Sequence, residues 1–107
     1  MKGDAMKLDQ QYPELANFLG SEFPDADLEG LSDEEVVKRY AFRASPKMRS
    51  RVIEKGKALL AEKVFPREEI SYEANRYFSD SEDARQWLTM IIQILESTSF
   101  YSEPKAK

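Results

Sequence analysis

The chain contains no cysteine and no histidine, so two of the most versatile catalytic side chains are missing. Thiol chemistry, disulfide bonds, catalytic triads that depend on histidine and nearly all zinc sites are therefore excluded. No stretch approaches the ~18–20 continuous apolar residues of a membrane span. The N-terminal residues also lack the apolar core of a signal peptide. We therefore expect a cytoplasmic protein without a membrane segment, a metal or a cofactor.

Length and composition indicate a single folded domain. The chain has 107 residues, of which 41% are hydrophobic and 34% are charged. This length suits one hydrophobic core and is short for two. We expect one helical domain over residues 12–101, preceded by a polar extension at 1–11 and followed by a charged tail at 102–107.

Charge is distributed unevenly along the chain, although its net value is only -4. Residues 1–35 hold 10 acids and 2 bases, whereas residues 36–76 hold 5 acids and 11 bases. Residues 77–107 hold 5 acids and 3 bases. The N-terminal third is thus strongly acidic and the middle of the chain is basic.

The acidic excess is greatest between Glu22 and Glu35, a stretch called the acidic segment below. It contains seven acids and no lysine or arginine. Phe23, Leu28 and Leu31 interrupt it, whereas a disordered acidic tail would lack such apolar residues. We expect a loop that these side chains hold down, with carboxylates facing outward toward a basic partner. The alternative is a solvated acidic loop that leads into an ordinary helix cap.

Apolar spacing and capping signals predict helices joined by short loops. Gly20 is predicted to end the first helix, because glycine favours the left-handed position that follows a helix. Ser32 and Glu35 have the spacing of a capping box, which gives the acids beside them a structural role. The expected helices span residues 12–20, 32–44, 45–63, 66–78 and 83–97.

The last predicted helix is apolar around more than half of its circumference, so it should be packed on several sides. We therefore expect an all-α, compact bundle of about five helices with the last helix, at about 83–97, in its centre. Gly56 lies in the apolar stripe of the third helix and predicts close approach of a neighbouring helix. Tyr77 and Phe78 are placed on the inner stripe of the fourth helix, and Tyr72 lies off that stripe.

The residues alone leave two other functions open. Bases such as Lys47, Arg49 and Arg51 cover much of the third helix and would suit nucleic acid, but a solvated helix surface explains them as well. Neither aromatic interleaving nor a glycine-rich phosphate loop accompanies them. Carboxylates in the acidic segment would suit a Mg²⁺-dependent helical hydrolase, but the second Glu-x-x-Glu pair of such enzymes is missing. We therefore expect a protein that is not an enzyme.

Several short motifs, taken in their order and spacing, resemble one known family. They are Y-P-E-L-A-N-F-L-G at 12–20, D-x-D-L-E at 25–29, S-D-E-E-V-V at 32–37, S-P-K-M-R-S-R-V-I-E at 45–54, A-L-L-A-E at 58–62 and R-Q-W-L-T-M-I at 85–91. This pattern is similar to that of the immunity proteins of bacterial contact-dependent growth inhibition systems. The resemblance covers about residues 12–96.

The resemblance implies a cytoplasmic antitoxin that binds the toxic C-terminal domain of a large exported adhesin one-to-one, and that does not itself bind nucleic acid or membrane. The toxin is often a nuclease, whose active site or substrate access the immunity protein blocks. A nuclease that grips phosphate needs a basic cleft, which an acidic surface would complement. The residues expected to face the partner are Glu22, Phe23, Asp25, Asp27, Glu29, Asp33, Glu34 and Tyr72, with Phe23 and Tyr72 as anchors.

Overall fold

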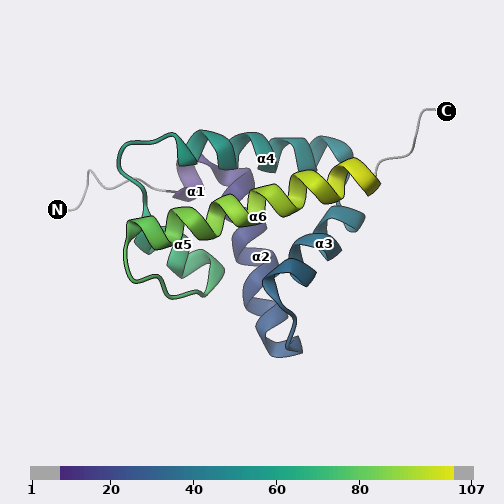
Figure 1. The fold of residues 1–107 in the computed structure, drawn as a ribbon, viewed down its shortest axis with the longest axis horizontal. Helices are drawn as coiled ribbons and strands as arrows, with labels where there is room; N and C mark the ends of the chain where they lie inside the picture. The colour runs from purple at the N-terminus through teal and green to yellow at the C-terminus, as the bar shows by residue number, and fades with distance from the viewer. Residues whose placement is uncertain (1–7, 103–107) are drawn as a thin grey trace.

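The computed structural model describes residues 8–102, with side chains up to residue 98. Residues 1–7 and 103–107, which include most of the predicted extension and tail, lie outside this range. The described chain is all-α, as predicted, with six helices instead of about five (Figure 1). The helices are α1 (Leu8–Gln11), α2 (Pro13–Glu29), α3 (Asp33–Arg43), α4 (Pro46–Leu60), α5 (Arg67–Ala74) and α6 (Ser81–Ser102).

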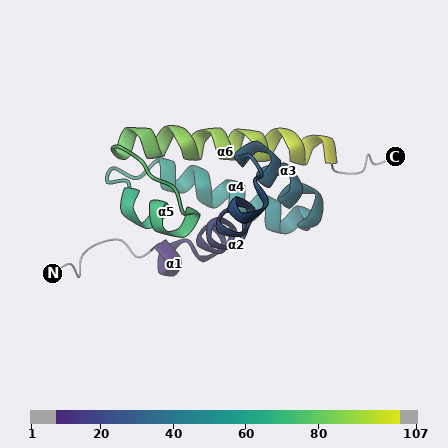
Figure 2. The same cartoon turned by 90° about the horizontal axis from the view of Figure 1, so that it is seen from below.

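The last helix, α6, contacts three other helices, as its wide apolar surface predicts. It packs against α3, α4 and α5, and both views show α4 running beside it (Figures 1 and 2). The approach of α4 is close at Gly56, where a Cβ atom would lie 2.8 Å from Cγ1 of Ile92. The prediction of tight helix packing at Gly56 is therefore confirmed. The buried side chains of α6 include Ala84, Leu88, Ile91, Ile92 and Leu95.

The second helix is longer than predicted, because it continues past Gly20 and Pro24 to Glu29. Pro24 has no amide hydrogen to donate to the carbonyl of Gly20, so the helix loses one hydrogen bond there. Phe23 and Ala26 nevertheless extend its buried stripe at helical spacing. Burial of this stripe stabilises the helix by more than the helix-breaking tendency of Gly20 and Pro24 destabilises it. The prediction that the acidic segment is a loop is therefore wrong.

A three-residue connection turns α2 into α3. Gly30 adopts the left-handed conformation at φ 73°. The amides of Gly30 and Leu31 donate to carbonyls of the last turn of α2 at 3.3 and 3.2 Å, which is the Schellman arrangement. Ser32 then caps α3, since its Oγ accepts from the Glu35 amide at 3.1 Å and its own amide donates to Glu35 Oε1 at 2.8 Å. The predicted capping box is confirmed.

Two other regions differ from their predicted structure. Residues 8–11 form α1 with Leu8 buried, where a polar extension is predicted. The fifth helix ends at Ala74, because Asn75 takes the left-handed conformation at φ 58°. Tyr77 therefore lies beyond the helix and is exposed, so its predicted place on an inner stripe is wrong. Phe78 is buried as predicted.

The carboxyl of Glu73 lies against α2, with Oε1 2.7 Å from the position a Cβ would take on Gly20. Burial, together with the charge of Asp9, raises the pKa of Glu73 above its usual 4.5. A raised pKa in the folded state means that stability is lost as pH rises through that pKa, because the ionised form is disfavoured. We expect Glu73→Gln to increase the free energy of unfolding at neutral pH by about 0.5 kcal/mol, since the site is only partly buried.

Urea denaturation of wild type and variant at neutral pH and at about pH 3 checks this prediction. At the acidic pH, Glu73 is protonated in the wild type and the difference should disappear. Glu68→Gln is the control, because it removes a well-exposed carboxylate from the same helix. The prediction would be contradicted if both variants were stabilised equally, or if Glu73→Gln were less stable than the wild type at neutral pH.

Candidate partner-binding surface

The acidic segment is bound to α3 by ion pairs within the molecule. Glu29 accepts a hydrogen bond from Arg39 at 2.7 Å, and this bond raises the pKa of Arg39. Glu22 pairs with Arg43 one helical turn further along α3. Glu22 is buried, so the prediction that its carboxylate faces outward is wrong. Both carboxylates therefore fasten α2 to its neighbour.

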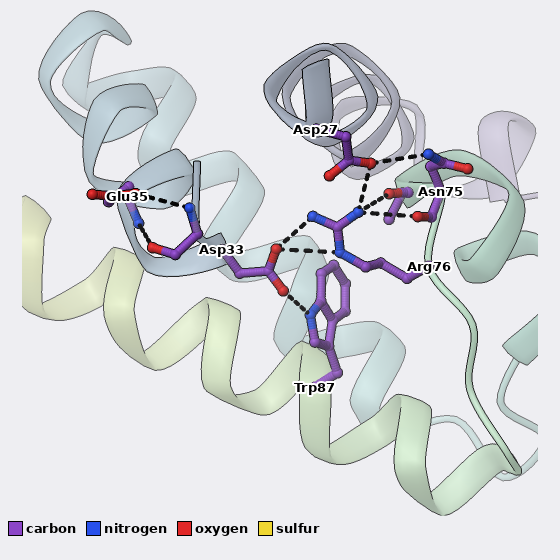
Figure 3. A network of polar contacts seen from close by, with 8 residues as sticks. Asp27, Asp33, Glu35, Asn75, Arg76 and Trp87 are labelled. Carbon is purple, nitrogen blue, oxygen red and sulfur yellow. Dashed lines mark hydrogen bonds and ion pairs between the residues drawn. The ribbon is translucent and has the colours of Figure 1, made fainter. Parts of the chain in front are cut away.

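On the side of α2 that faces α5, a polar network joins four parts of the chain (Figure 3). Arg76 donates to Asp27 at 2.9 Å through Nη1 and to Asp33 at 2.5 and 3.2 Å through Nη2 and Nε. Asn75 donates a further hydrogen bond to Asp27 at 2.9 Å. The indole of Trp87 donates to the other Asp33 oxygen at 2.7 Å. The network ties α2 and the start of α3 to α6 and to the loop before it.

The electrostatics of this network favour the ionised carboxylate of Asp27. Hydrogen bonds from Arg76 and then Asn75 lower the pKa of Asp27. Burial alone would lower the pKa of Arg76, but the hydrogen bonds to Asp33 and Asp27 outweigh it and raise that pKa. The Arg76 guanidinium also lies 5.4 Å from the centre of the Phe23 ring, within cation–π range. Asp27 and Asp33 are thus already engaged before any partner arrives.

Most of the charge in the acidic segment is balanced by the basic middle of the chain. Five of its seven acids pair with four bases, including Glu34, which bonds to Lys38 at 2.8 Å. Glu35 closes the capping box. Asp25 is exposed and makes no ion pair within the described residues. Seven acids against four bases leave a residual charge of -3 on this surface.

The apolar residues of the acidic segment have different roles from those expected. Phe23 is fully buried, and its ring lies 5.2 Å from the ring of Trp87 and 5.7 Å from that of Phe18. It holds the segment on the core, as predicted, but the prediction that it is also a partner-facing anchor is wrong. Leu28 is 90% exposed, so the prediction that it holds the segment down is wrong. Leu31 packs against the core while partly exposed.

Two tyrosines are strongly exposed near this surface. Tyr72 on α5 is 83% exposed, as its position off the apolar stripe predicts. Tyr77 is 84% exposed, and sequence reasoning missed it. The available signal was Asn75, because asparagine tolerates the left-handed conformation that ends a helix. Reading Asn75 as a helix end would have placed Tyr77 outside the core.

The basic middle of the chain offers fewer available cations than its sequence suggests. Arg49 is buried and donates to the carbonyls of Ala41 and Ala44 at 2.8 and 2.7 Å, at the end of α3. Arg51 pairs with Glu14 at 3.1 Å. Nucleic-acid binding depends on bases that are available to neutralise phosphates. The predicted alternative of a nucleic-acid surface on these helices therefore loses part of its support.

The structure adds no support for metal chemistry. Within the described side chains, no group of three or more acids is placed to hold a metal ion. Glu68 and Glu69 are adjacent acids, but they lie in the first turn of α5, where negative charge favours the helix dipole. No helix in that part of the chain is long and apolar enough to span a membrane.

Comparison with known proteins gives one match. A family model described as CdiI immunity protein matches residues 11–95. No curated protein and no solved structure matches the chain. The matched range includes α2 to α5 and most of α6, and therefore all of the surface residues described above.

Proposed function

This chain belongs to the CdiI immunity protein family, and on that premise we propose that it binds and neutralises the toxin domain of a contact-dependent growth inhibition system. The observation that carries the proposal is the family match over residues 11–95, nearly all of the described chain. The activity is inhibition by binding inside the cell, so it requires no catalytic group and no cofactor. The proposed partner is one copy of a nuclease domain, whose active site or substrate access the protein covers.

Charge supports a basic partner. The acidic segment keeps a residual charge of -3, and Asp25 at its outer surface has no intramolecular ion pair among the described residues. A cleft that binds phosphate is basic and would be attracted to this surface. Of the residues predicted to face the partner, those that the structure leaves accessible are retained in the proposal. They are Asp25, Asp27, Glu29, Asp33, Glu34 and Tyr72.

The proposal is tested by titrating the protein into the toxin domain encoded immediately upstream of its own gene. We expect nanomolar one-to-one binding, measured by calorimetry, with loss of the toxin's nuclease activity at the same stoichiometry. Absence of binding would overturn the proposal. Binding without loss of activity would overturn the inhibitory mechanism.

Asp25 gives the cleanest test of electrostatic attraction, because it forms no ion pair within the described residues and its charge acts on Arg39 only at longer range. We expect Asp25→Lys to lower the association rate constant several-fold at low salt, and the effect to fade at high salt as charges are screened. Glu54→Lys is the matched control, since Glu54 is exposed on α4, outside the acidic segment. Stopped-flow association at several salt concentrations measures both. Equal slowing by the two variants would show that only net charge matters.

A further inference from the structure

Three large exposed side chains lie on the segments of chain that carry the ion pair between Asp27 and Arg76. Leu28 follows Asp27 in the chain, and Tyr77 follows Arg76. Because Asp27 and Arg76 are joined at 2.9 Å, Leu28 and Tyr77 are held on neighbouring segments of backbone. Tyr72 lies in the last turn of α5, just before the Asn75 that also bonds to Asp27. Leu28, Tyr72 and Tyr77 are called the apolar patch below.

Helical geometry places Leu28 on the solvent side of α2. At about 100° per residue, Gly20 and Asp27 point in nearly the same direction, and both contact α5 or its terminal Asn75. Glu22 and Glu29 point roughly the opposite way, toward the arginines of α3. Leu28 points in a direction between the side of α2 that faces α5 and the side that faces α3. Asp25 lies on the same part of the helix circumference. The Asp25 carboxylate and the exposed leucine therefore lie on one accessible surface.

The apolar patch has no evident role in the fold. All three of its side chains are more than four-fifths exposed, whereas the packing of this region is carried by Phe23 and Trp87, whose rings contact each other. Tyrosine is enriched among the residues that dominate protein–protein binding energy, because it buries a large area while keeping a hydroxyl for hydrogen bonding. A group of exposed apolar side chains rimmed by charge is also typical of interaction surfaces.

We infer that the apolar patch is the energetic centre of the toxin-binding surface, and that Asp25 and the Asp27–Arg76 pair form its polar rim. This inference rests on the proposed function and names the part of the surface that supplies most of the binding free energy. The occupant is a basic toxin domain with an apolar pocket ringed by lysine or arginine. Charge complementarity identifies it, because the surrounding surface keeps a residual charge of -3.

The paired carboxylates are less suited to this central role. Glu29 and Glu34 would have to exchange Arg39 and Lys38 for toxin bases, and that exchange replaces one exposed ion pair by another. Such pairs contribute little net free energy. Asp27 would have to give up Arg76, whose side chain is largely buried. Burial of the leucine and the two tyrosines, by contrast, is gained only on binding. Affinity should therefore depend on the patch, while the acids govern the rate of encounter.

Alanine substitution with matched controls tests the inference. The substitutions Leu28→Ala and Tyr77→Ala are compared with Val64→Ala and Met48→Ala, whose side chains are 80% and 40% exposed on the α4–α5 loop and on α4. Binding to the upstream-encoded toxin domain is measured by calorimetry. We expect each patch variant to bind at least about tenfold more weakly and each control less than about threefold. Circular dichroism checks that the fold is retained, since all four side chains are exposed.

The outcomes separate this inference from the proposed function. Failure of the wild type to bind the toxin overturns the proposed function itself. Wild-type binding that Leu28→Ala and Tyr77→Ala leave unchanged, or that the controls weaken as much, overturns only the role of the patch. Sedimentation of the free protein gives a further check. A dimer that Tyr77→Ala dissociates would assign the patch to a second copy of this chain, and that too would overturn the inference.

Discussion

Replacing Phe23 by alanine is expected to lower the free energy of unfolding by about 3–5 kcal/mol, the usual cost of removing a buried phenylalanine. The ring is fully buried and contacts Phe18 and Trp87, so its loss leaves a cavity between α2 and α6. It also removes the aromatic surface beneath the Arg76 guanidinium. Total stabilities are only about 5–15 kcal/mol, so a large part of the fold's stability depends on this residue.

Urea denaturation followed by circular dichroism measures this loss. Leu28→Ala is the matched control, because Leu28 lies in the same helix and the same acidic segment but is exposed. The control is expected to change stability by less than about 0.5 kcal/mol. Equal losses for the two variants would contradict the arrangement described here, in which Phe23 belongs to the core and Leu28 to the surface.

Gly56→Ala is expected to destabilise the protein by about 1–3 kcal/mol, although alanine is the better helix former by ~1 kcal/mol. The added Cβ would lie 2.8 Å from Cγ1 of Ile92 and closer still to its Cδ1. Ile92 is buried, so its side chain has little room to move away. Overpacking between α4 and α6 therefore outweighs the gain in helix propensity.

A double-mutant cycle isolates this contact. Ile92→Ala removes both of the atoms that the new Cβ would meet. In that background, Gly56→Ala is expected to be neutral or stabilising, because only the propensity term remains. Thermal or urea denaturation of the four proteins gives the coupling free energy. Additive losses in the double variant would show that the cost of alanine at position 56 arises elsewhere.

Local signals predicted the helix starts better than the helix ends. The capping box at Ser32 and Glu35 was readable because both hydrogen bonds are local, and each is present in the structure. Gly20 and Pro24 carry equally local signals for a break, yet α2 passes through both. The difference is tertiary, since burial of Phe23 and Ala26 stabilises a helix that the local sequence disfavours. A single sequence does not show which of these contributions is larger.

The candidate surface was predictable in its composition and not in its pairing. The sequence shows an acidic segment and a basic middle. It does not show that Asp27 and Asp33 both pair with Arg76, which lies more than 40 residues further along the chain. The contact of Asp33 with Trp87 spans 54 residues. Nothing local indicates such pairs, because they depend on how the helices pack. The same reasoning explains why Glu22 was expected at the surface and lies buried against Arg43.

Trp87 also gives the protein a built-in optical label. It is the only tryptophan of the chain, and its indole contacts Phe23 and Phe78 while donating to Asp33. Its emission therefore comes from one place, where α2, α3, α6 and the loop before α6 meet. Loosening of that junction would expose the indole to water and shift the emission to longer wavelength. Fluorescence of the unmodified protein can thus follow this junction during unfolding and, against a toxin domain without tryptophan, during binding.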